Sequence, residues 1–150
     1  MACPSPLLIL TLFLFSLNQV SYAETDTLKP GQQLHDWQQL VSEGEVFRLG
    51  FFNPNPKSSV DIGVSGPRYI GIWFNNTPFY SVWVANRENP VPDSSGTLTV
   101  DTHGKLQITY QDGSPIVINP GQAVTKRTSR GNFTATLLDS GNLVLRQVLS

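Results

Sequence analysis

The stretch Thr97 to Tyr110, TLTVDTHGKLQITY, is the clearest indication of the fold, because two short runs of strand-forming residues in it flank a turn. In the second run, apolar Leu106, Ile108 and Tyr110 alternate with polar side chains. Successive side chains of a strand point to opposite faces of a sheet, so this run has one buried and one wet face. Between the runs, residues 101–104, Asp-Thr-His-Gly, place glycine where a tight reversal tends to need a positive φ. The stretch therefore predicts a β-hairpin packed on a core.

Similar short runs recur along the chain and indicate a protein made almost entirely of strands. Residues 111–113, Gln-Asp-Gly, and 139–142, Asp-Ser-Gly-Asn, provide further glycine-containing turns. The best helical candidate, residues 35–42, is short and rich in glutamine, so helix is a minor element at most. We expect strands at residues 45–52, 69–74, 80–85, 97–100, 105–110, 116–118, 122–126, 133–138 and 142–146, and irregular loops at 53–67 and 89–96. This spacing favours an all-β sandwich, barrel or prism.

A weak internal repeat supports a symmetric architecture. Residues 97–108 align with residues 135–145 when one extra residue is allowed in the first turn. Both segments contain a strand, an Asp-led turn with glycine and a second strand, a pattern typical of stacked or radially repeated β units. By pattern alone, they could equally be two unrelated hairpins.

Charge and composition exclude several classes of protein. The chain has 150 residues, with 10 Lys and Arg against 11 Asp and Glu, which excludes a nucleic-acid binder that works by bulk electrostatics. At 39% hydrophobic residues it is too apolar for a disordered chain. The length allows one domain and leaves no room for a protein kinase. We find no catalytic motif, and His35 and His103 lack partners at a metal-ligand spacing, so we expect neither an enzyme, a cofactor nor a metal site.

The first 23 residues have the pattern of a secretory signal peptide. Residues 7–17, LLILTLFLFSL, form an uncharged apolar run, and residues 21–23, Ser-Tyr-Ala, form a small-x-small cleavage site. The run is shorter than the ~20 residues of a membrane span. Because no Lys or Arg precedes it, an uncleaved anchor stays open as the alternative. Cleavage after Ala23 would leave residues 24–150, or 150 - 23 = 127 residues, as one mature domain.

The predicted mature chain has no cysteine, because the single cysteine, Cys3, lies in the leader. Disulfides, thiolate metal sites and cysteine nucleophiles are therefore excluded for it. Two N-glycosylation sequons are present, Asn75-Asn76-Thr77 and Asn132-Phe133-Thr134. Beside a leader they predict glycans at Asn75 and Asn132, on loops that face solvent.

Four segments occur in an order that identifies a family resemblance. They are FRLGFFNP at 47–54, YIGIWF at 69–74, VWVANRENP at 82–90 and LLDSGNLVLR at 137–146. The chain resembles the bulb-type (monocot mannose-binding) lectin domain of plant S-locus glycoproteins and G-type lectin receptor-like kinases, over about residues 24–147. The resemblance implies a β-prism of three small antiparallel sheets about a pseudo-threefold axis. It also implies a module on the extracellular side, secreted or part of a longer receptor at the plasma membrane.

The resemblance implies a core to which large apolar side chains such as Trp73 and Trp83 contribute, and we expect Phe47 there too. Both tryptophans sit in strands flanked by Ile, Val and Phe, which favours core packing over stacking on a sugar. Trp37 lies among Gln and Asp residues. Its burial is open, and stacking on a ligand or partner is its alternative role.

At the sugar-binding positions of this family, the sequence of this chain departs from the family pattern. Bulb-type lectins bind mannose through Gln-x-Asp-x-Asn-x-Val-x-Tyr. Aligned on Asn142 and Val144, this chain has Leu138, Ser140 and Arg146 at the Gln, Asp and Tyr positions. A lost charged hydrogen bond is worth ~1.5 to 3 kcal/mol. The sequence therefore predicts a degenerate ligand site at Ser140, Asn142, Val144 and Arg146, where ordinary mannose binding is doubtful.

In the earlier repeat none of the five pattern positions matches the mannose pattern. These positions hold Asp101, His103, Lys105, Gln107 and Thr109. The structural alternative for residues 139–142 is a plain hairpin turn, with Asp and Gly placed for backbone geometry.

Two functions stay open: a lectin that binds a glycan, and a scaffold ectodomain that binds an extracellular or cell-surface protein. The family pattern also predicts that the lectin domain is cut short at its C-terminal end, which fits a receptor fragment or a secreted stub. We expect the last strand, which contains Val148, to leave an unpaired edge through which the chain self-associates.

Overall fold

The computed structural model describes residues 24–54, 66–121 and 131–148. The predicted leader and the predicted strand at residues 122–126 lie outside these described residues. Within them the chain forms strands joined by turns and loops: β1 (Thr27–Leu28), β2 (Gln33–His35), β3 (Gln39–Val41), β4 (Phe47–Phe52), β5 (Tyr69–Phe74), β6 (Thr77–Val84), β7 (Thr97–Val100), β8 (Leu106–Thr109), β9 (Ile116–Val117), β10 (Asn132–Leu137) and β11 (Leu143–Val148). In this described part, no helix is long and apolar enough to cross a membrane.

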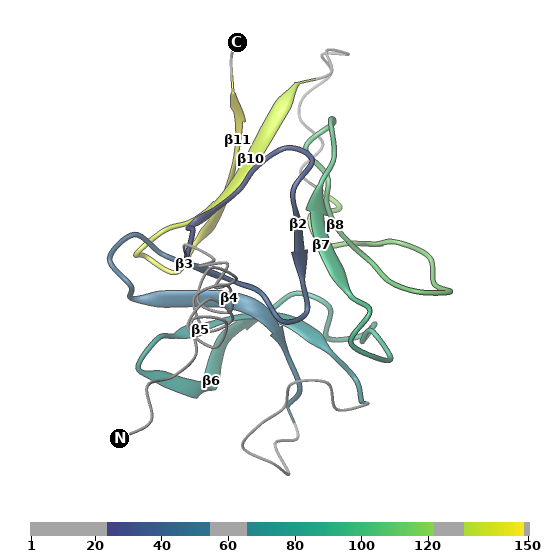
Figure 1. Cartoon of the computed structure of the whole chain (residues 1–150), viewed down its shortest axis with the longest axis horizontal. Coiled ribbons are helices and arrows are strands. Elements are labelled where there is room, and N and C mark those ends of the chain that lie inside the picture. The colour runs from purple at the N-terminus through teal and green to yellow at the C-terminus, as the bar shows by residue number, and fades with distance from the viewer. Residues whose placement is uncertain (1–23, 55–65, 122–130, 149–150) are drawn as a thin grey trace, which may run out of the picture.

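The strands form three antiparallel sheets that surround one core (Figure 1). Their strand orders are β3-β4-β5-β6, β2-β7-β8-β9 and β1-β10-β11, and we name them the β4, β7 and β10 sheets. In Figure 1 the β4 sheet lies across the lower half, the β7 sheet at the right and the β10 sheet at the top. The expected all-β architecture of three small antiparallel sheets is confirmed.

The three sheets share one plan, which accounts for the repeat in the sequence. Each sheet begins with a strand from the N-terminal run, since β1, β2 and β3 follow one another in the chain but join different sheets. A hairpin follows in each case: β4–β5, β7–β8 or β10–β11. The two aligned segments are thus equivalent hairpins of two sheets. Among the described strands, the β10 sheet has three and the others have four.

The core collects the inward faces of all three sheets. Leu49 and Ile70 come from the β4 sheet, Leu98 and Ile108 from the β7 sheet, and Leu137 from the β10 sheet, and all five are fully buried. The alternation seen in the sequence produces this arrangement, because β7, β8 and β10 bury every second residue. Phe47 is buried in the same cluster.

The two tryptophans differ from the expected arrangement around a shared centre. Trp73 is buried, but it lies on the outer face of the β4 sheet, where its ring meets Phe52 edge-on at 6.2 Å between centroids. Trp83 pairs with Ile72 and faces inward, yet 37% of its surface is exposed. It belongs to β6, an edge strand of the described sheet, so neighbours cover it on one side only. Aliphatic side chains and the rings of Phe47, Phe51 and Phe133 make up the core cluster instead.

Several local expectations need correction. The helical candidate at residues 35–42 is instead the end of β2, a turn and β3, and its one leucine, Leu40, is buried in the core from β3. Among residues 111–113 it is Asp112 that has a positive φ, of 58°, while a side chain at Gly113 would collide with the ring of Tyr110. The loop at residues 89–96 is not wholly irregular, since Val91 bridges to Arg68 and is fully buried.

Candidate functional site

The predicted ligand residues lie on the β10–β11 hairpin. Ser140 and Asn142 are in its turn, where the Asn142 side-chain amide donates to the Ser140 hydroxyl at 3.1 Å. Val144 and Arg146 follow on β11 and pair with Thr136 and Thr134. These partners alternate with the buried residues of β10, so Val144 and Arg146 lie on the outward face of the sheet. The four residues thus stand at every second position from the turn along the strand, and we call them the hairpin row.

The carboxylate of Asp139 is next to Ser140 in the chain, but it already accepts a hydrogen bond within the fold. The Asp139 carboxylate accepts a hydrogen bond from the backbone N–H of Gly44 at 2.9 Å. Hydrogen bonds from Ser42 and Gly44 hold the pKa of Asp139 below its ordinary value. Asp139 therefore joins the hairpin of the β10 sheet to the β3–β4 loop of the β4 sheet.

The shape of the turn is set by close packing. Gly141 has a φ of 78°, as expected from the sequence, and a Cβ on it would approach the ring of Phe47 to 3.0 Å. Leu138 and Asn142 close the turn with a backbone hydrogen bond of 2.9 Å. The turn chemistry at residues 139–142 thus serves the fold, and the row has an amide, a hydroxyl and a guanidinium for a ligand but no carboxylate of its own.

On the β7–β8 hairpin, the first of the five pattern positions, Asp101, also stabilises the turn. Oδ1 of Asp101 accepts from the backbone N–H groups of His103 and Lys105, both at 2.8 Å. Gln107 and Thr109 lie on the outward face, paired with Thr99 and Thr97. Within the described residues, no group of three or more His, Cys, Asp or Glu is placed to hold a metal ion.

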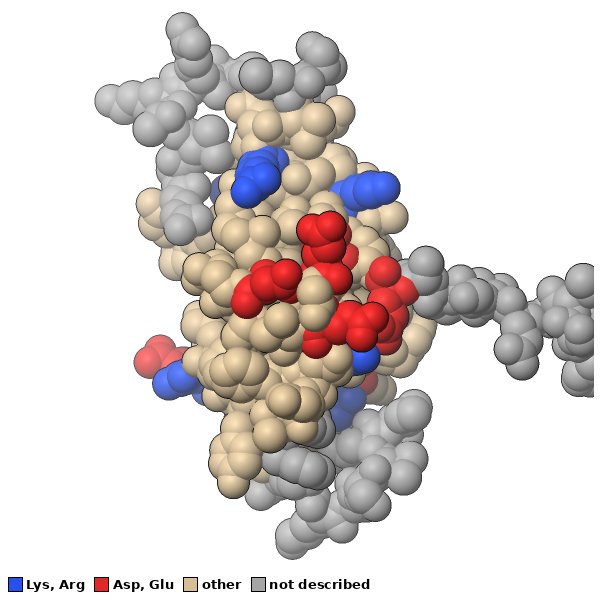
Figure 2. Space-filling model, turned by 90° about the vertical axis from the view of Figure 1, so that its left-hand side faces the viewer, with Lys and Arg blue, Asp and Glu red and all other residues tan. Residues whose placement is uncertain are grey.

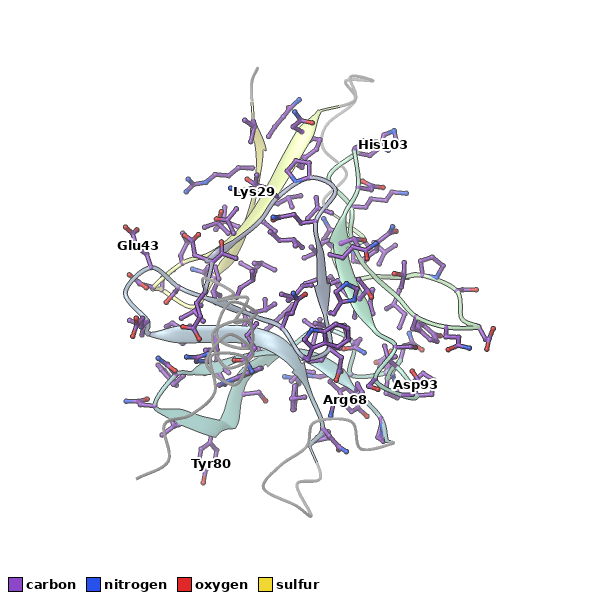
Figure 3. The ribbon with its side chains drawn as sticks, viewed as in Figure 1. Lys29, Glu43, Arg68, Tyr80, Asp93 and His103 are labelled. Atoms are coloured by element: carbon purple, nitrogen blue, oxygen red, sulfur yellow. The ribbon has the colours of Figure 1, made fainter. Side chains whose placement is uncertain are left out.

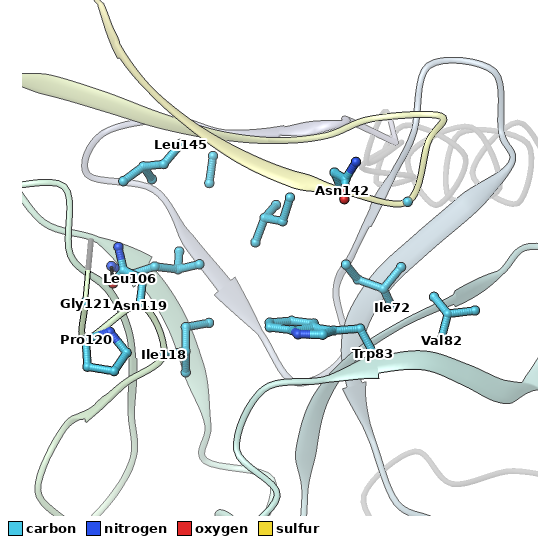
Figure 4. Close-up of a pocket in the computed structure, with 13 residues that line it drawn as sticks. Ile72, Val82, Trp83, Leu106, Ile118, Asn119, Pro120, Gly121, Asn142 and Leu145 are labelled. Atoms are coloured by element: carbon cyan, nitrogen blue, oxygen red, sulfur yellow. Dashed lines mark hydrogen bonds between the residues drawn. The ribbon is translucent and has the colours of Figure 1, made fainter. Parts of the chain in front are cut away.

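A cavity of about 570 Å³ opens between the inward faces of the sheets (Figure 4). Trp83 and Ile72 line it from the β4 sheet, Leu106 from the β7 sheet, and Leu145 and Asn142 from the β10–β11 hairpin. Its lining is mixed: aliphatic side chains alternate with polar surface, to which Asn119 and Asn142 contribute amides. Sequence analysis missed this cavity, because its lining residues come from all three sheets.

The two sequons differ in their surroundings. Asn132 is exposed at the start of β10. Asn75 is part of the fold: its Oδ1 accepts from Nε of Arg48 at 2.5 Å and its amide donates to the carbonyl of Glu45 at 2.9 Å. Glycosylation at either asparagine stays a prediction, and Asn132 is the more accessible acceptor.

Trp37, whose burial the sequence leaves open, is 66% exposed. It borders a second cavity, of about 480 Å³, between β1, β2 and β3. On the neighbouring face of the molecule, Asp and Glu side chains gather in one patch (Figure 2). Glu24, Asp26, Glu43 and Glu45 share one hollow there.

Comparison with known proteins relates the chain to plant lectin receptors. The D-mannose binding lectin family matches residues 81–150. The chain is 43% identical over 145 residues to the G-type lectin S-receptor-like serine/threonine-protein kinase CES101 of Arabidopsis thaliana, covering 94% of this chain and 15% of that protein. It is 41% identical over 152 residues to the corresponding kinase At1g67520 of the same plant, covering 97% of this chain and 17% of that one.

Among solved structures, a lectin from Allium sativum has a similar fold, with a TM-score of 0.53 at 16% identity. The match covers 83% of this chain and 98% of the lectin. The chain therefore spans roughly a sixth of the length of the curated kinases and almost the whole of the lectin. It contains the lectin portion of those kinases and no kinase domain.

Proposed function

Because the chain carries a bulb-type lectin domain homologous to the extracellular lectin domains of G-type lectin S-receptor-like kinases, we propose that it is an extracellular recognition module that binds a glycan. The observation that carries the proposal is the combination of this homology with the three-sheet fold shared with the Allium sativum lectin. The domain has no catalytic role in the proposal, and any kinase activity would belong to a longer protein.

The geometry of the hairpin row argues against ordinary mannose binding there. A shallow sugar site depends on a few hydrogen bonds, and a charged one contributes about 1.5 to 3 kcal/mol. Ser140 offers a hydroxyl where the family pattern has a carboxylate, and the nearby Asp139 is bound to Gly44. In the proposal, Asn142 and Arg146 add contacts to a glycan without specifying mannose.

The proposed location rests on the sequence of the leader. The apolar run at residues 7–17 and the site at residues 21–23 favour export with cleavage after Ala23. Residues 24–150 would then form the mature lectin domain, with a glycan at Asn132 and a second sequon at Asn75. Intact-mass spectrometry of the secreted product tests this: a retained leader or an absent glycan would contradict it.

A glycan array with the secreted protein tests the proposed function. We expect saturable binding to at least one glycan class. Asn142→Ala should weaken binding wherever the hairpin row takes part, while Lys105→Ala, at a pattern position of the other hairpin, is a matched control. Binding to no glycan at concentrations up to about 1 mM, a Kd that corresponds to only about -4 kcal/mol, would contradict a lectin function.

A second candidate function, binding of a protein, is favoured by the exposed apolar side chains of β6. Tyr80, which projects from the molecule in Figure 3, is 75% exposed, and Val82 and Trp83 are also exposed on the same edge strand. Edge strands pair readily with other chains, and contiguous exposed apolar surface marks interaction sites. Loss of protein capture on Tyr80→Ala, in a chain that binds no glycan, would favour this function.

A further inference from the structure

A turn that occurs twice in the N-terminal run is closed by backbone and glutamine hydrogen bonds, without the Trp37 ring. Gln-Gln-Leu occurs at residues 32–34 and again at 38–40. The turn before each copy has the same hydrogen bonds: Gln32 N–H donates to the Lys29 carbonyl at 3.0 Å, and Gln38 N–H to the His35 carbonyl at 2.9 Å. In each turn the glutamine side-chain oxygen also accepts from the first residue's N–H, at 2.9 Å.

The two copies of this turn differ in the residue at the third position. It is Gly31 in the first turn, with a φ of 76° and no atom within 4 Å of a Cβ placed there. In the second turn it is Trp37, whose φ is not positive, so the two turns share their hydrogen bonds but not their backbone conformation. None of the hydrogen bonds that close the second turn involves the indole. Exposing two-thirds of a tryptophan is also unfavourable in water, so its presence points to a ligand.

The Trp37 ring is held in place before any ligand arrives. His35 stacks on it, with the ring centroids 4.8 Å apart and the planes 3° from parallel. The neighbouring Asp36 is fixed by a two-bond ion pair with Arg68, in which both side chains are buried. With one ring face against His35, the opposite face is the one that solvent reaches. A pre-positioned ring loses little conformational freedom when it binds.

The cavity beside Trp37 combines an apolar floor with amide walls. Leu28, Leu34 and Leu40, one from the first strand of each sheet, line it and are buried. Gln32, Gln33, Gln38, Gln39 and Arg48 also line it. At about 480 Å³, it is within the range of small-ligand sites.

The fold orients the amides of this cavity. The side-chain oxygens of Gln32 and Gln38 are bound in their turns, and that of Gln39 accepts from Nη1 of Arg48 at 3.1 Å. A fixed carboxamide oxygen leaves the NH₂ group, with its two donors, in a defined direction. Such donors suit the hydroxyl, ring and acetamido oxygens of a sugar, while an aromatic ring suits its apolar face.

Charge around the cavity selects against acidic ligands. Nη1 of Arg48 is paired with Glu24 at 3.0 Å, so the cation lining the cavity is already neutralised. Glu24 also lines the acidic hollow that contains Asp26 and Glu45. A uronate or phosphate brought here would meet like charge.

We propose that the cavity between β1, β2 and β3 binds a neutral saccharide, with Trp37 stacked on a sugar ring and the glutamine amides hydrogen-bonded to its oxygens. This inference rests on the glycan-binding function proposed above and names its site. It places the principal contact away from the β10–β11 hairpin, where the family pattern predicts it. It also explains how the domain can bind sugar although that hairpin is degenerate.

Titration calorimetry with the secreted full chain tests the site. The probes are the neutral oligomers cellotetraose, chitotetraose and mannotetraose, with tetragalacturonate as the acidic comparison. For the best neutral probe, we expect Trp37→Ala to weaken binding at least tenfold and Trp37→Phe to weaken it less. Val117→Ala is the control, since it removes an exposed apolar side chain from β9, and it should change the affinity less than twofold.

Each outcome distinguishes this inference from the function on which it rests. Sugar binding that survives Trp37→Ala but is lost on Asn142→Ala would overturn the inference and keep the lectin function. Preference for tetragalacturonate would overturn the neutral class. Absence of binding to any glycan would overturn both. Because Trp37 is exposed, its variants should melt like the parent protein, and a melting shift as large as that of Asp36→Ala would assign the ring a structural role instead.

Discussion

The ion pair between Asp36 and Arg68 gives the sharpest test of how the domain is held together. Nε and Nη2 of Arg68 donate to Oδ1 and Oδ2 of Asp36, and each side chain is only 5% exposed. Figure 3 shows Arg68 below β2, near the lower sheet. Asp36→Ala would leave a buried guanidinium without its carboxylate. Breaking a buried pair from one side costs about 3 to 5 kcal/mol, a large share of the roughly 5 to 15 kcal/mol that stabilise a domain.

The expected melting shift follows from the size of the domain. Unfolding entropy is about 2.1 cal/mol/K per residue, so the 127 residues from 24 to 150 give about 270 cal/mol/K. A loss of about 3 to 5 kcal/mol then lowers Tm by about 11 to 19 °C. Thermal unfolding followed by circular dichroism measures this directly.

Two controls isolate the effect of burial. Glu24→Ala breaks the ion pair between Glu24, whose side chain is 54% exposed, and Arg48, whose side chain is 25% exposed. It should lower the free energy of unfolding by less than about 1 kcal/mol. In the double variant Asp36→Leu with Arg68→Met, the charge is removed from both sides, so much of the lost stability should return. If Asp36→Ala melts within about 3 °C of the parent, or no lower than Glu24→Ala, the reasoning is refuted.

Three further predictions concern other parts of the fold. The pKa of Asp139 is depressed in the folded chain, so its stabilising effect is present above the ordinary carboxyl pKa and lost as pH falls through the lower value. Urea titrations of Asp139→Asn should therefore show a stability difference from the parent at about pH 6 that shrinks as pH falls below the ordinary carboxyl pKa. Trp73→Ala should cost about 3 to 5 kcal/mol in the same assay, and a change below about 1 kcal/mol would contradict its buried position. Because β11 is an edge strand among the described residues, light scattering should detect self-association that Val148→Lys reduces, whereas a monomer at all concentrations would contradict an open edge.

Local patterns in the sequence were sufficient for the β7–β8 and β10–β11 hairpins and for the buried face of β8. The alternation at residues 105–110 and the turns at residues 101–104 and 139–142 predict hairpins that the structure contains. Strand period and turn chemistry are properties of neighbouring residues, so sequence can reveal them. The sequence did not predict strands β1 and β2, because two or three residues are too few to show an alternating pattern. Their pairing partners also lie more than 60 residues away in the chain.

The candidate site was only partly accessible from the sequence. Alignment with the family pattern located Ser140, Asn142, Val144 and Arg146, and the structure places them in one row on the hairpin. No pattern indicated that Asp139 would bind Gly44, 95 residues away, because that contact depends on how two sheets meet. The binding role of the four residues stays a prediction.

Spacing within a few residues was enough to predict an all-β chain, the inward direction of Leu106 and Ile108, and the family that the chain resembles. The contents of the core and the side chains left uncovered follow from the packing of all three sheets. This packing places Trp73 on an outer face, leaves Trp83 partly uncovered on an edge strand and presents Trp37 beside a cavity. A side chain in this fold is covered by strands from other sheets. Its burial therefore depends on how the whole chain packs around one core.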